Sequence, residues 1–362
     1  MRVDDLLDHG AHVASVCNAC RYCEQFCPVF PAIEQRLFFE KRDLVYLANL
    51  CHNCGECLYS CQFAPPHEFG IDVPRTMARI RERTYEEYAW PRWLASALRR
   101  NGPTSALTLA GVMAALFLAA VWVTNPQVLW QPGITADFYS VVPHAVMVAL
   151  FGAVGLMVLM ALSIGGIRFW REAAQSGAFT AAALAAALRD ALTLRHLHTP
   201  DAECVSGEEQ RTPWRRRFHH FTFYGFALCF ASTTVAAVYH ELGFEAPYAY
   251  ASVPVILGTA GGFGLLIGPA GLWLLRRRRD PALGGGIDSV GADEAFLVLL
   301  VATSLTGLLL LAFRHSAAMS VLLLVHLGAV LALFLTLPYG KFAHGLYRTL
   351  ALVRYRREVT RD

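Results

Sequence analysis

The chain has 362 residues, of which 55% are hydrophobic and only 16% are charged, and its formal net charge is +3 at pH 7. Soluble globular proteins carry about 25% charged residues, so this composition excludes one soluble globule and indicates a protein mostly embedded in a membrane. The length allows two domains. The N-terminal residues contain no apolar stretch of the signal-peptide type, so we expect this region to remain in the cytoplasm.

Residues 1–90 form a polar region that holds eight of the ten cysteines. They occur as two copies of one spacing, Cys17-x2-Cys20-x2-Cys23-x3-Cys27 and Cys51-x2-Cys54-x2-Cys57-x3-Cys61. This is the ligand spacing of bacterial ferredoxins with two clusters, in which the fourth cysteine of each run binds the other cluster. The spacing therefore predicts two [4Fe–4S] clusters, the first held by Cys17, Cys20, Cys23 and Cys61 and the second by Cys51, Cys54, Cys57 and Cys27.

Other uses of these cysteines fit the pattern less well. Disulfides belong to small secreted scaffolds, whereas Cys-x2-Cys pairs can also hold zinc. Two identical runs of three plus one cysteines favour clusters over a pair of zinc sites. Pro28 follows the first run as the ferredoxin pattern requires, whereas Gln62 follows the second, which affects a turn and not the ligands. Cys204 and Cys229 lie outside the pattern, and we interpret Cys229 as a small apolar residue within a span.

The N-terminal region is expected to continue into the membrane through helices. We expect a helix over residues 34–50, between the two cysteine runs, and a break at Pro65-Pro66. Residues 72–100 are rich in Arg, Glu and aromatic side chains and predict an amphipathic helix and a linker at the membrane surface. The expected domains are a two-cluster ferredoxin-like domain at 1–90, a linker at 91–104, a membrane domain at 105–345 and a cytoplasmic tail at 346–362.

Six apolar stretches follow, each near the roughly 20 residues that a membrane-spanning helix needs. The fourth is rich in glycine and contains Pro254 and Pro269, so we expect it to be kinked or closely packed. Within the long loop 165–217, the Ala/Leu-rich stretch 178–194 predicts a surface helix. The fold class is therefore mainly α, with a ferredoxin-like domain followed by a six-helix transmembrane bundle. The expected spans are 105–124, 141–164, 218–239, 252–275, 295–313 and 318–339.

The arginines indicate the orientation of these spans. The loop 165–217, the segment 276–279 and the C-terminal tail are rich in arginine, whereas residues 125–140 and 240–251 contain neither Lys nor Arg. Because positive residues are retained on the cytoplasmic side, we expect a multi-pass protein of the bacterial inner membrane with both termini in the cytoplasm. The arginine runs flank apolar spans, so we interpret most of them as topology signals in contact with the lipid bilayer and not as a nucleic-acid site.

Seven of the thirteen histidines lie in or at the ends of the spans, where an ionisable residue is a functional hypothesis. Helical spacing places those of the third and sixth spans at two depths, His219 level with His344 and His240 near the level of His326. Two histidines at each of two depths are what bis-histidine b haems require. The sequence therefore predicts one or two b haems. The expected axial ligands are His219, His240, His326 and His344, with His220 and His144 as alternates to His219 and His240.

The remaining polar residues give weaker indications. We interpret five histidines as ordinary surface residues, namely His12, His52, His67, His196 and His198. The sequence does not identify a quinone site. Lys341, His315 and Arg314 are candidates for it, and interfacial anchoring is their other interpretation.

Four segments carry a resemblance to a known family. Two contain the cysteine runs, CNACRYCEQFCPVF and CHNCGECLYSCQFAPPHEFGID, and two lie in the membrane domain, RFHHFTFYGFALCFASTT and VHLGAVLALFLTLPYGKFAHGLYR. With them the whole chain resembles the citrate/tricarballylate utilization B-type proteins of bacteria. The two membrane segments are also similar to the cytochrome b subunits of nitrate reductases and heterodisulfide reductases.

The resemblance implies an electron-transfer component and not a stand-alone catalyst. In that family a soluble FAD-dependent tricarballylate dehydrogenase oxidises tricarballylate to cis-aconitate. The B-type protein reoxidises the flavin and passes the electrons through clusters and haem to membrane quinone. By the same resemblance the eight cysteines hold the clusters, and His219, His326 and His344 match haem-binding histidines of the related cytochromes.

Three other functions are alternatives. A quinone-linked subunit of another complex, similar to heterodisulfide or nitrate reductase, fits the same motifs and differs in its partner. A tricarboxylate transporter needs charge or broken helices at the midplane of the membrane, whereas the spans contain almost no charge. A cluster-based redox sensor does not need histidines paired at two depths.

Overall fold

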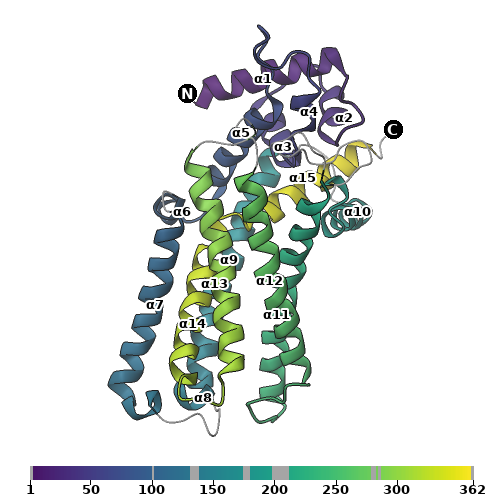
Figure 1. Cartoon of the computed structure of the whole chain (residues 1–362). Coiled ribbons are helices and arrows are strands. Elements are labelled where there is room, and N and C mark those ends of the chain that lie inside the picture. Colours follow the sequence, from purple (N-terminus) through teal and green to yellow (C-terminus); the bar gives the residue numbers. More distant parts are fainter. Residues whose placement is uncertain are drawn as a thin grey trace.

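The chain folds into a helical domain seated on one end of a long helical bundle (Figure 1). The computed structural model describes residues 3–99, 102–130, 138–173, 180–197, 212–278, 283 and 287–359. Within these ranges the regular secondary structure is helical, without a strand, which confirms the predicted mainly α fold. We call the end of the bundle next to the N-terminal domain the proximal end and the opposite end the distal end.

Five helices build the core of the N-terminal domain. Buried apolar side chains from several of them, including Val13, Ile33, Leu47 and Ile80, pack into one cluster, so burial of apolar surface holds the domain together. A sixth helix leads on to the bundle. The helices are α1 (Val3–Cys20), α2 (Val29–Glu34), α3 (Lys41–Leu50), α4 (Glu56–Tyr59), α5 (Val73–Tyr88) and α6 (Arg92–Arg99).

The helix predicted over residues 34–50 is shorter than expected. Glu34 is the last residue of α2, and α3 begins only at Lys41, after an extended Glu40. Helix α1, which carries Cys17 and Cys20, was not among the predicted elements. The amphipathic helix expected after residue 72 is present as α5, and Asp72 caps it by accepting a hydrogen bond from the backbone N of Arg75 at 3.0 Å.

Six helices are long and apolar enough to cross a membrane, in agreement with the six predicted spans. The second is longer than expected, because it runs past residue 164 to Ala173. Large apolar side chains such as Leu116, Leu156 and Phe230 are more than half exposed on the bundle, as lipid-facing residues are. The spanning segments are Pro103–Thr124 (α7), His144–Ala173 (α9), Trp214–Glu241 (α11), Val253–Arg277 (α12), Asp293–Ala312 within α13 (Ile287–Ala312), and Met319–Val359.

Shorter elements connect these helices. Turn η1 (Pro126–Leu129) and helix α8 (Phe138–Val141) lie at the distal end, and helix α10 (Ala181–Leu192) matches the surface helix expected within 178–194. The side chain of Thr180 caps α10. Turn η2 (Arg195–Leu197) follows α10.

Helices α11 and α12 form a closely packed pair. Gly268 lies so near α11 that a Cβ atom there would be 2.5 Å from the backbone N of Thr222, and Gly225 meets the backbone of α12 in the same way. Small residues at such crossings let two helices approach in a membrane, which explains the glycines of the fourth span. Helix α11 makes no comparably extensive contact with another described helix, and in Figure 1 the pair stands beside the other spans.

The last span is broken at its proximal end. Helix α14 (Met319–Thr336) stops at the turn η4 (Leu337–Tyr339), and α15 (Ala343–Val359) then leaves at an angle (Figure 1). Residues 346–362 were expected to form a cytoplasmic tail, but through Val359 they are helical. Tyr347, Ala351 and Val353 belong to the buried core of the N-terminal domain. The end of the chain therefore ties that domain to the bundle.

Candidate metal centres

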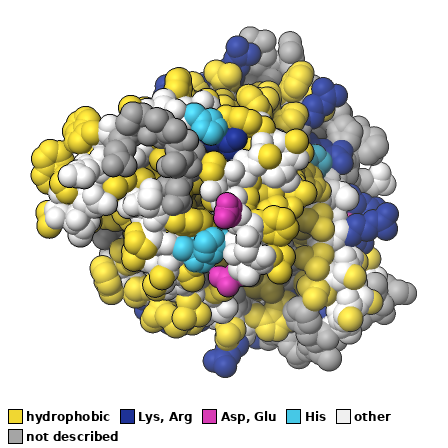
Figure 2. Space-filling view, turned by 90° about the horizontal axis from the view of Figure 1, so that it is seen from below, with side chains coloured by type: hydrophobic (Ala, Val, Ile, Leu, Met, Phe, Trp, Pro, Cys, Tyr) yellow, Lys and Arg dark blue, Asp and Glu magenta, His cyan; other side chains and the backbone are white. Residues whose placement is uncertain are grey.

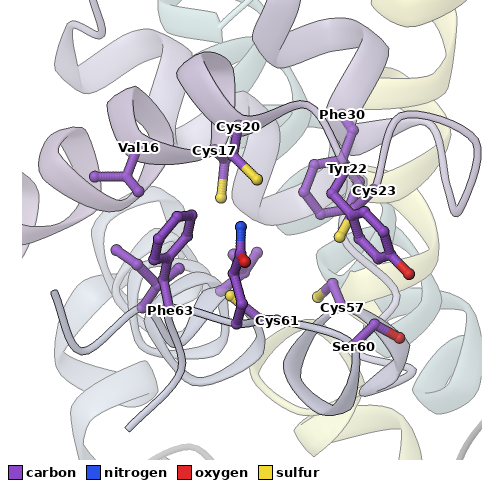
Figure 3. Close-up of a pocket in the computed structure, with 13 residues that line it drawn as sticks. Val16, Cys17, Cys20, Tyr22, Cys23, Phe30, Cys57, Ser60, Cys61 and Phe63 are labelled. Carbon is purple, nitrogen blue, oxygen red and sulfur yellow. The ribbon is translucent and has the colours of Figure 1, made fainter. Parts of the chain in front are cut away.

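The first set of predicted cluster ligands surrounds one cavity. Cys17 and Cys20 end α1, Cys23 follows in the next loop, and Cys61 comes after α4. All four line a cavity of about 290 Å³, and Figure 3 shows the sulfur atoms of Cys17 and Cys20 pointing into it. A zinc ion draws its thiolates to about 2.3 Å from one point, so a cavity of this size suits a larger group than one ion.

The second set lines a narrower pocket of about 10 Å³ beside the first. Its loop takes left-handed conformations at Asn53 (φ 57°) and Gly55 (φ 94°), which turn the chain between the cysteines. Cys57 lines both pockets, so the two sets are neighbours. The fourth cysteine of each run thus lies with the other run, as the ferredoxin pattern predicts. The thiols of the second pocket are those of Cys27, Cys51, Cys54 and Cys57.

The surroundings of Cys17 and Cys27 favour the protonated thiol when no metal is bound. Burial, followed by the charges of Cys23, Cys61 and Cys20, raises the pKa of Cys17 to about 12. Burial likewise raises the pKa of Cys27 well above its ordinary value, with Cys54 and Cys51 adding to the effect. A bound metal reverses this, because coordination deprotonates a thiol outright. In the described part of the chain, no three His, Cys, Asp or Glu side chains group closely enough to hold a single metal ion.

Three arginines from different helices form hydrogen bonds with the backbone at the second cysteine run. Arg81 of α5 donates to the carbonyl oxygens of Cys51 and of Ala48. Arg348 of α15 donates to the same Cys51 oxygen at 2.7 Å. Arg215 of α11 donates to the carbonyl oxygens of His52 and Asn53 at 3.0 and 2.9 Å. Sequence reasoning interpreted most arginines as topology signals, but Arg215 and Arg348 bind the cysteine loop directly.

His52 is not the surface residue that the sequence suggested. It is only 6% exposed and lines the second pocket. Its Nδ1 lies 3.1 Å from the carbonyl oxygen of Leu50, and its buried Nε2 has no hydrogen-bond partner. Burial lowers its pKa well below the ordinary value. Its position between Cys51 and Cys54 was the signal in the sequence, because every residue of such a loop lies beside the cluster ligands. His198 lies outside the described residues.

At the proximal end of the bundle, His219 of α11 faces His344 of α15. Their ring centroids are 5.9 Å apart, and the rings are nearly perpendicular at 79°. Nδ1 of His219 is buried without a hydrogen-bond partner, whereas Nδ1 of His344 contacts the carbonyl oxygen of Lys341. Metal–imidazole bonds are about 2 Å long, so two axial ligands of one iron have ring centroids about 6 Å apart. The separation of this pair fits that requirement.

The expected partnership of His240 with His326 is not what the structure contains. The ring of His240 lies against the alternate candidate His144, with centroids 3.9 Å apart, and Tyr139 packs beside both. His326 instead faces α13, where its Nδ1 is 3.1 Å from Oγ1 of Thr306. Depth alone predicted the pairing, but depth does not specify which neighbouring helix a side chain faces.

The alternate candidate His220 points away from the proximal pair. Its ring lies near Tyr224 on α11, at 5.7 Å between centroids, and its buried Nε2 has no hydrogen-bond partner. The three quinone-site candidates have other contacts. Lys341 forms an ion pair with Asp293 at 2.8 Å. Arg314 lies over the ring of Tyr250, and its Nε lies 3.2 Å from Nε2 of His315.

Comparison with known proteins identifies the family of the chain. The sequence model described as citrate utilization protein B matches residues 98–362, and the one described as the Fer4-like domain of that protein matches residues 10–87. The chain belongs to the citrate utilization protein B family. A relative from Escherichia coli, citrate utilization protein B, is 50% identical over 345 residues, which are 95% of this chain and 90% of the relative. No solved structure matches the chain.

The two matched ranges divide the site residues of this family member cleanly. The Fer4-like range covers all eight cysteines of the two runs, together with Arg81. The C-terminal range covers the histidines of the bundle and the two remaining arginines of the three, Arg215 and Arg348. The hydrogen bonds of Arg215 and Arg348 to the second cysteine loop therefore join the two matched parts of the chain.

Proposed function

We propose that the protein is an iron–sulfur electron carrier of citrate or tricarballylate utilization. It accepts electrons from a reduced, soluble FAD-dependent dehydrogenase and delivers them to membrane quinone, with two [4Fe–4S] clusters and b haem as its cofactors. The family membership and its Fer4-like domain support the iron–sulfur role. The tricarballylate dehydrogenase and the quinone are supported by the resemblance of the sequence alone, whereas the haem is also supported by the geometry of His219 and His344.

One observation carries the proposal, namely the order of the candidate centres along the molecule. The first thiol pocket adjoins the second, because Cys57 and Phe30 line both. The loop of the second pocket is held by Arg215 and Arg348. His219 and His344 lie four residues from these arginines on the same helices, which is about 6 Å along a helix. Such a chain of neighbours is what stepwise electron transfer requires.

The residues of the chain have distinct roles in this proposal. The bound cofactors supply one-electron redox chemistry, and the protein sets their spacing and surroundings. Cys17, Cys20, Cys23 and Cys61 would hold the cluster farther from the bundle. The thiols of the second pocket would hold the nearer one, and they have to move apart to do so, since that pocket is narrow. Apolar side chains such as Phe30 exclude water from both pockets.

We propose one b haem, which the imidazoles of His219 and His344 would hold. Their 5.9 Å separation suits two ligands of one iron, whereas the 3.9 Å of the His144–His240 pair is too short for this without movement. In this proposal His326 is a structural residue that bonds to Thr306.

The proposed setting is the bacterial inner membrane, with the N-terminal domain and both termini in the cytoplasm. The arginine-rich segments support this orientation, because they lie at the proximal end of the bundle beside the N-terminal domain. Clusters are also built and kept reduced in the cytoplasm, where thiols are not oxidised to disulfides.

Cofactor analysis of the detergent-purified protein tests the proposal. We expect about eight cluster irons with matching sulfide, and a b-type spectrum that changes on reduction. Cys17→Ser and Cys51→Ser should each remove the iron and sulfide of one cluster, whereas the control Cys229→Ser, outside both runs, should remove none. Zinc without sulfide contradicts the iron–sulfur role. Clusters without haem contradict the role of the histidines.

The identity of the partner needs a second experiment. Mixing the protein with reduced FAD-dependent tricarballylate dehydrogenase and a soluble quinone analogue should give quinone reduction that depends on both proteins. Reduction of the clusters by dithionite but not by this dehydrogenase would point to another donor, as in a heterodisulfide- or nitrate-reductase-like complex.

A further inference from the structure

Three positive charges meet at the loop of the second thiol pocket. Arg81, Arg215 and Arg348 all donate to carbonyl oxygens within residues 48–53, and the charge of Arg348 acts on Cys51 itself. The side chains of Arg81 and Arg215 also act electrostatically on Arg348, so both lie near its guanidinium group. Arginine stays protonated in proteins, so all three carry a charge.

Among the described residues, no arginine or lysine side chain lines either pocket. The three guanidinium groups reach the second pocket through the carbonyl oxygens of Cys51, His52 and Asn53, which line it. The carboxylate of Glu56 acts on Cys23, a thiol of the first set. Arg21, the arginine of the first cysteine loop, is exposed and donates to the carbonyl oxygen of Asn18. The buried positive charge of Arg81 therefore lies with that of Arg215 and Arg348 at the second pocket.

Crowded guanidinium groups repel one another, and a negative group placed beside them relieves that repulsion. A [4Fe–4S] cluster with four thiolates carries a net charge of about −2, which becomes about −3 after one-electron reduction. Positive charge near a cluster therefore favours its reduced form, as do limited solvent exposure and hydrogen bonding.

We propose that Arg81, Arg215 and Arg348 raise the reduction potential of the cluster in the second pocket above that of the cluster in the first. The arginines thereby direct electrons toward the bundle and hinder their return. This inference rests on the proposed function, because it needs clusters in both pockets. It assigns the three arginines as positioning and electrostatic residues that act on the cofactor through the loop they hold.

An EPR-monitored redox titration of the purified full-length protein tests the inference. In Arg348→Gln and in Arg215→Gln, we expect one of the two cluster potentials to become more negative while the other holds its value. Arg348→Lys keeps the positive charge, so its cluster potential should stay close to that of the unaltered protein. The matched control is Arg83→Gln, because Arg83 lies on the same helix as Arg81 but is exposed and paired with Glu86.

The outcomes separate this inference from the proposed function. Unchanged potentials in glutamine variants that retain both clusters overturn the inference and leave the electron carrier intact. Equal shifts of both clusters, or a shift of the same size in Arg83→Gln, also overturn it. Loss of one cluster in both glutamine variants and in Arg348→Lys would show that the arginines only hold the cysteine loop in place. That outcome contradicts their electrostatic role. Absence of clusters in the unaltered protein contradicts the proposed function itself.

Discussion

The two ends of the bundle use the same residue type in different ways. At the proximal end, His219 and His344 are separated by 5.9 Å, and arginines four residues away anchor both helices to the second cysteine loop. At the distal end, His144 and His240 lie in contact at 3.9 Å. Figure 2 views the molecule from that end, and apolar side chains cover most of what it shows.

The difference indicates that the residues packed around a membrane histidine, and not merely its position on a membrane-spanning helix, decide whether it can bind a metal. Anchored helices can hold two rings at the distance that a metal needs, since each backbone is fixed from outside the pair. The comparison predicts a functional proximal end and a distal end with a packing role, and the following changes test it from the largest expected effect to the smallest.

Replacing a proximal histidine should have the largest effect. We expect His219→Ala or His344→Ala to abolish b-type absorbance, because either change removes an axial ligand of the proposed haem. The matched control, His240→Ala, should retain it. Pyridine-haemochrome analysis of the purified variants measures this. Loss of haem in His240→Ala with retention in His219→Ala would reverse the comparison, and equal partial loss in both would indicate two haems.

Breaking the ion-pair network that joins the last helix to the N-terminal domain should have a smaller, structural effect. Arg354 of α15 bonds Asp43 at 2.9 Å and Glu358 at 3.0 Å, and its side chain is only 8% exposed. Removing one partner of a buried pair costs about 3–5 kcal/mol, so Arg354→Ala should lower the thermal midpoint of the N-terminal domain.

Circular dichroism or limited proteolysis of the detergent-solubilised protein measures that loss. The control is Arg83→Ala, since the exposed Arg83–Glu86 pair is worth about 0–1 kcal/mol. Equal stability of the two variants would show that α15 does not anchor the proximal end through this network.

The same network predicts a modest dependence on acid. Burial alone would raise the pKa of Asp43, but hydrogen bonds and charges from Arg36 and Arg354 lower it overall. A carboxyl whose pKa is lower in the folded state stabilises the fold above its unfolded value of about 3.9. That contribution disappears as the pH falls through the lower folded value. We therefore expect the domain to lose stability below about pH 4.

Stability measured against pH checks this prediction. Asp43→Asn should be less stable at neutral pH and should show a weaker loss on acidification over the same range, since Asn does not titrate. A variant with an unchanged acid profile would mean that another carboxyl dominates. Glu87, which pairs with Lys41 at the surface, offers the comparison variant Glu87→Gln, for which we expect little change.

Much of the fold was predictable because local signals were strong. Six apolar stretches of membrane length can satisfy their backbone groups in lipid only as helices, so their number followed from hydropathy. The break after Thr336 was not predicted, although Pro338 and Gly340 mark it in retrospect. Helix α1 was also missed, although its Val13 and Ala14 pack into the same buried core as residues of α3 and α5.

The cysteine sets could be written down from spacing, because a loop of two residues between ligands leaves little freedom in how it wraps a cluster. The histidines were harder. His219 and His344 were correctly placed at one level, whereas His326 turned to Thr306 and His240 met His144. Nothing in the sequence distinguished Arg215 and Arg348 from the arginines that indicate membrane orientation.

By itself the sequence determined the eight thiols, the six spans and the family to which the chain belongs. All of these rest on short-range spacing and composition. Only the tertiary structure decided which histidines face each other, which arginines reach the second cysteine loop and that the last helix returns to the N-terminal domain. Such pairings depend on how helices far apart in sequence rotate and pack, and a change of one helical face, which costs nothing in hydropathy, moves a side chain to a different partner.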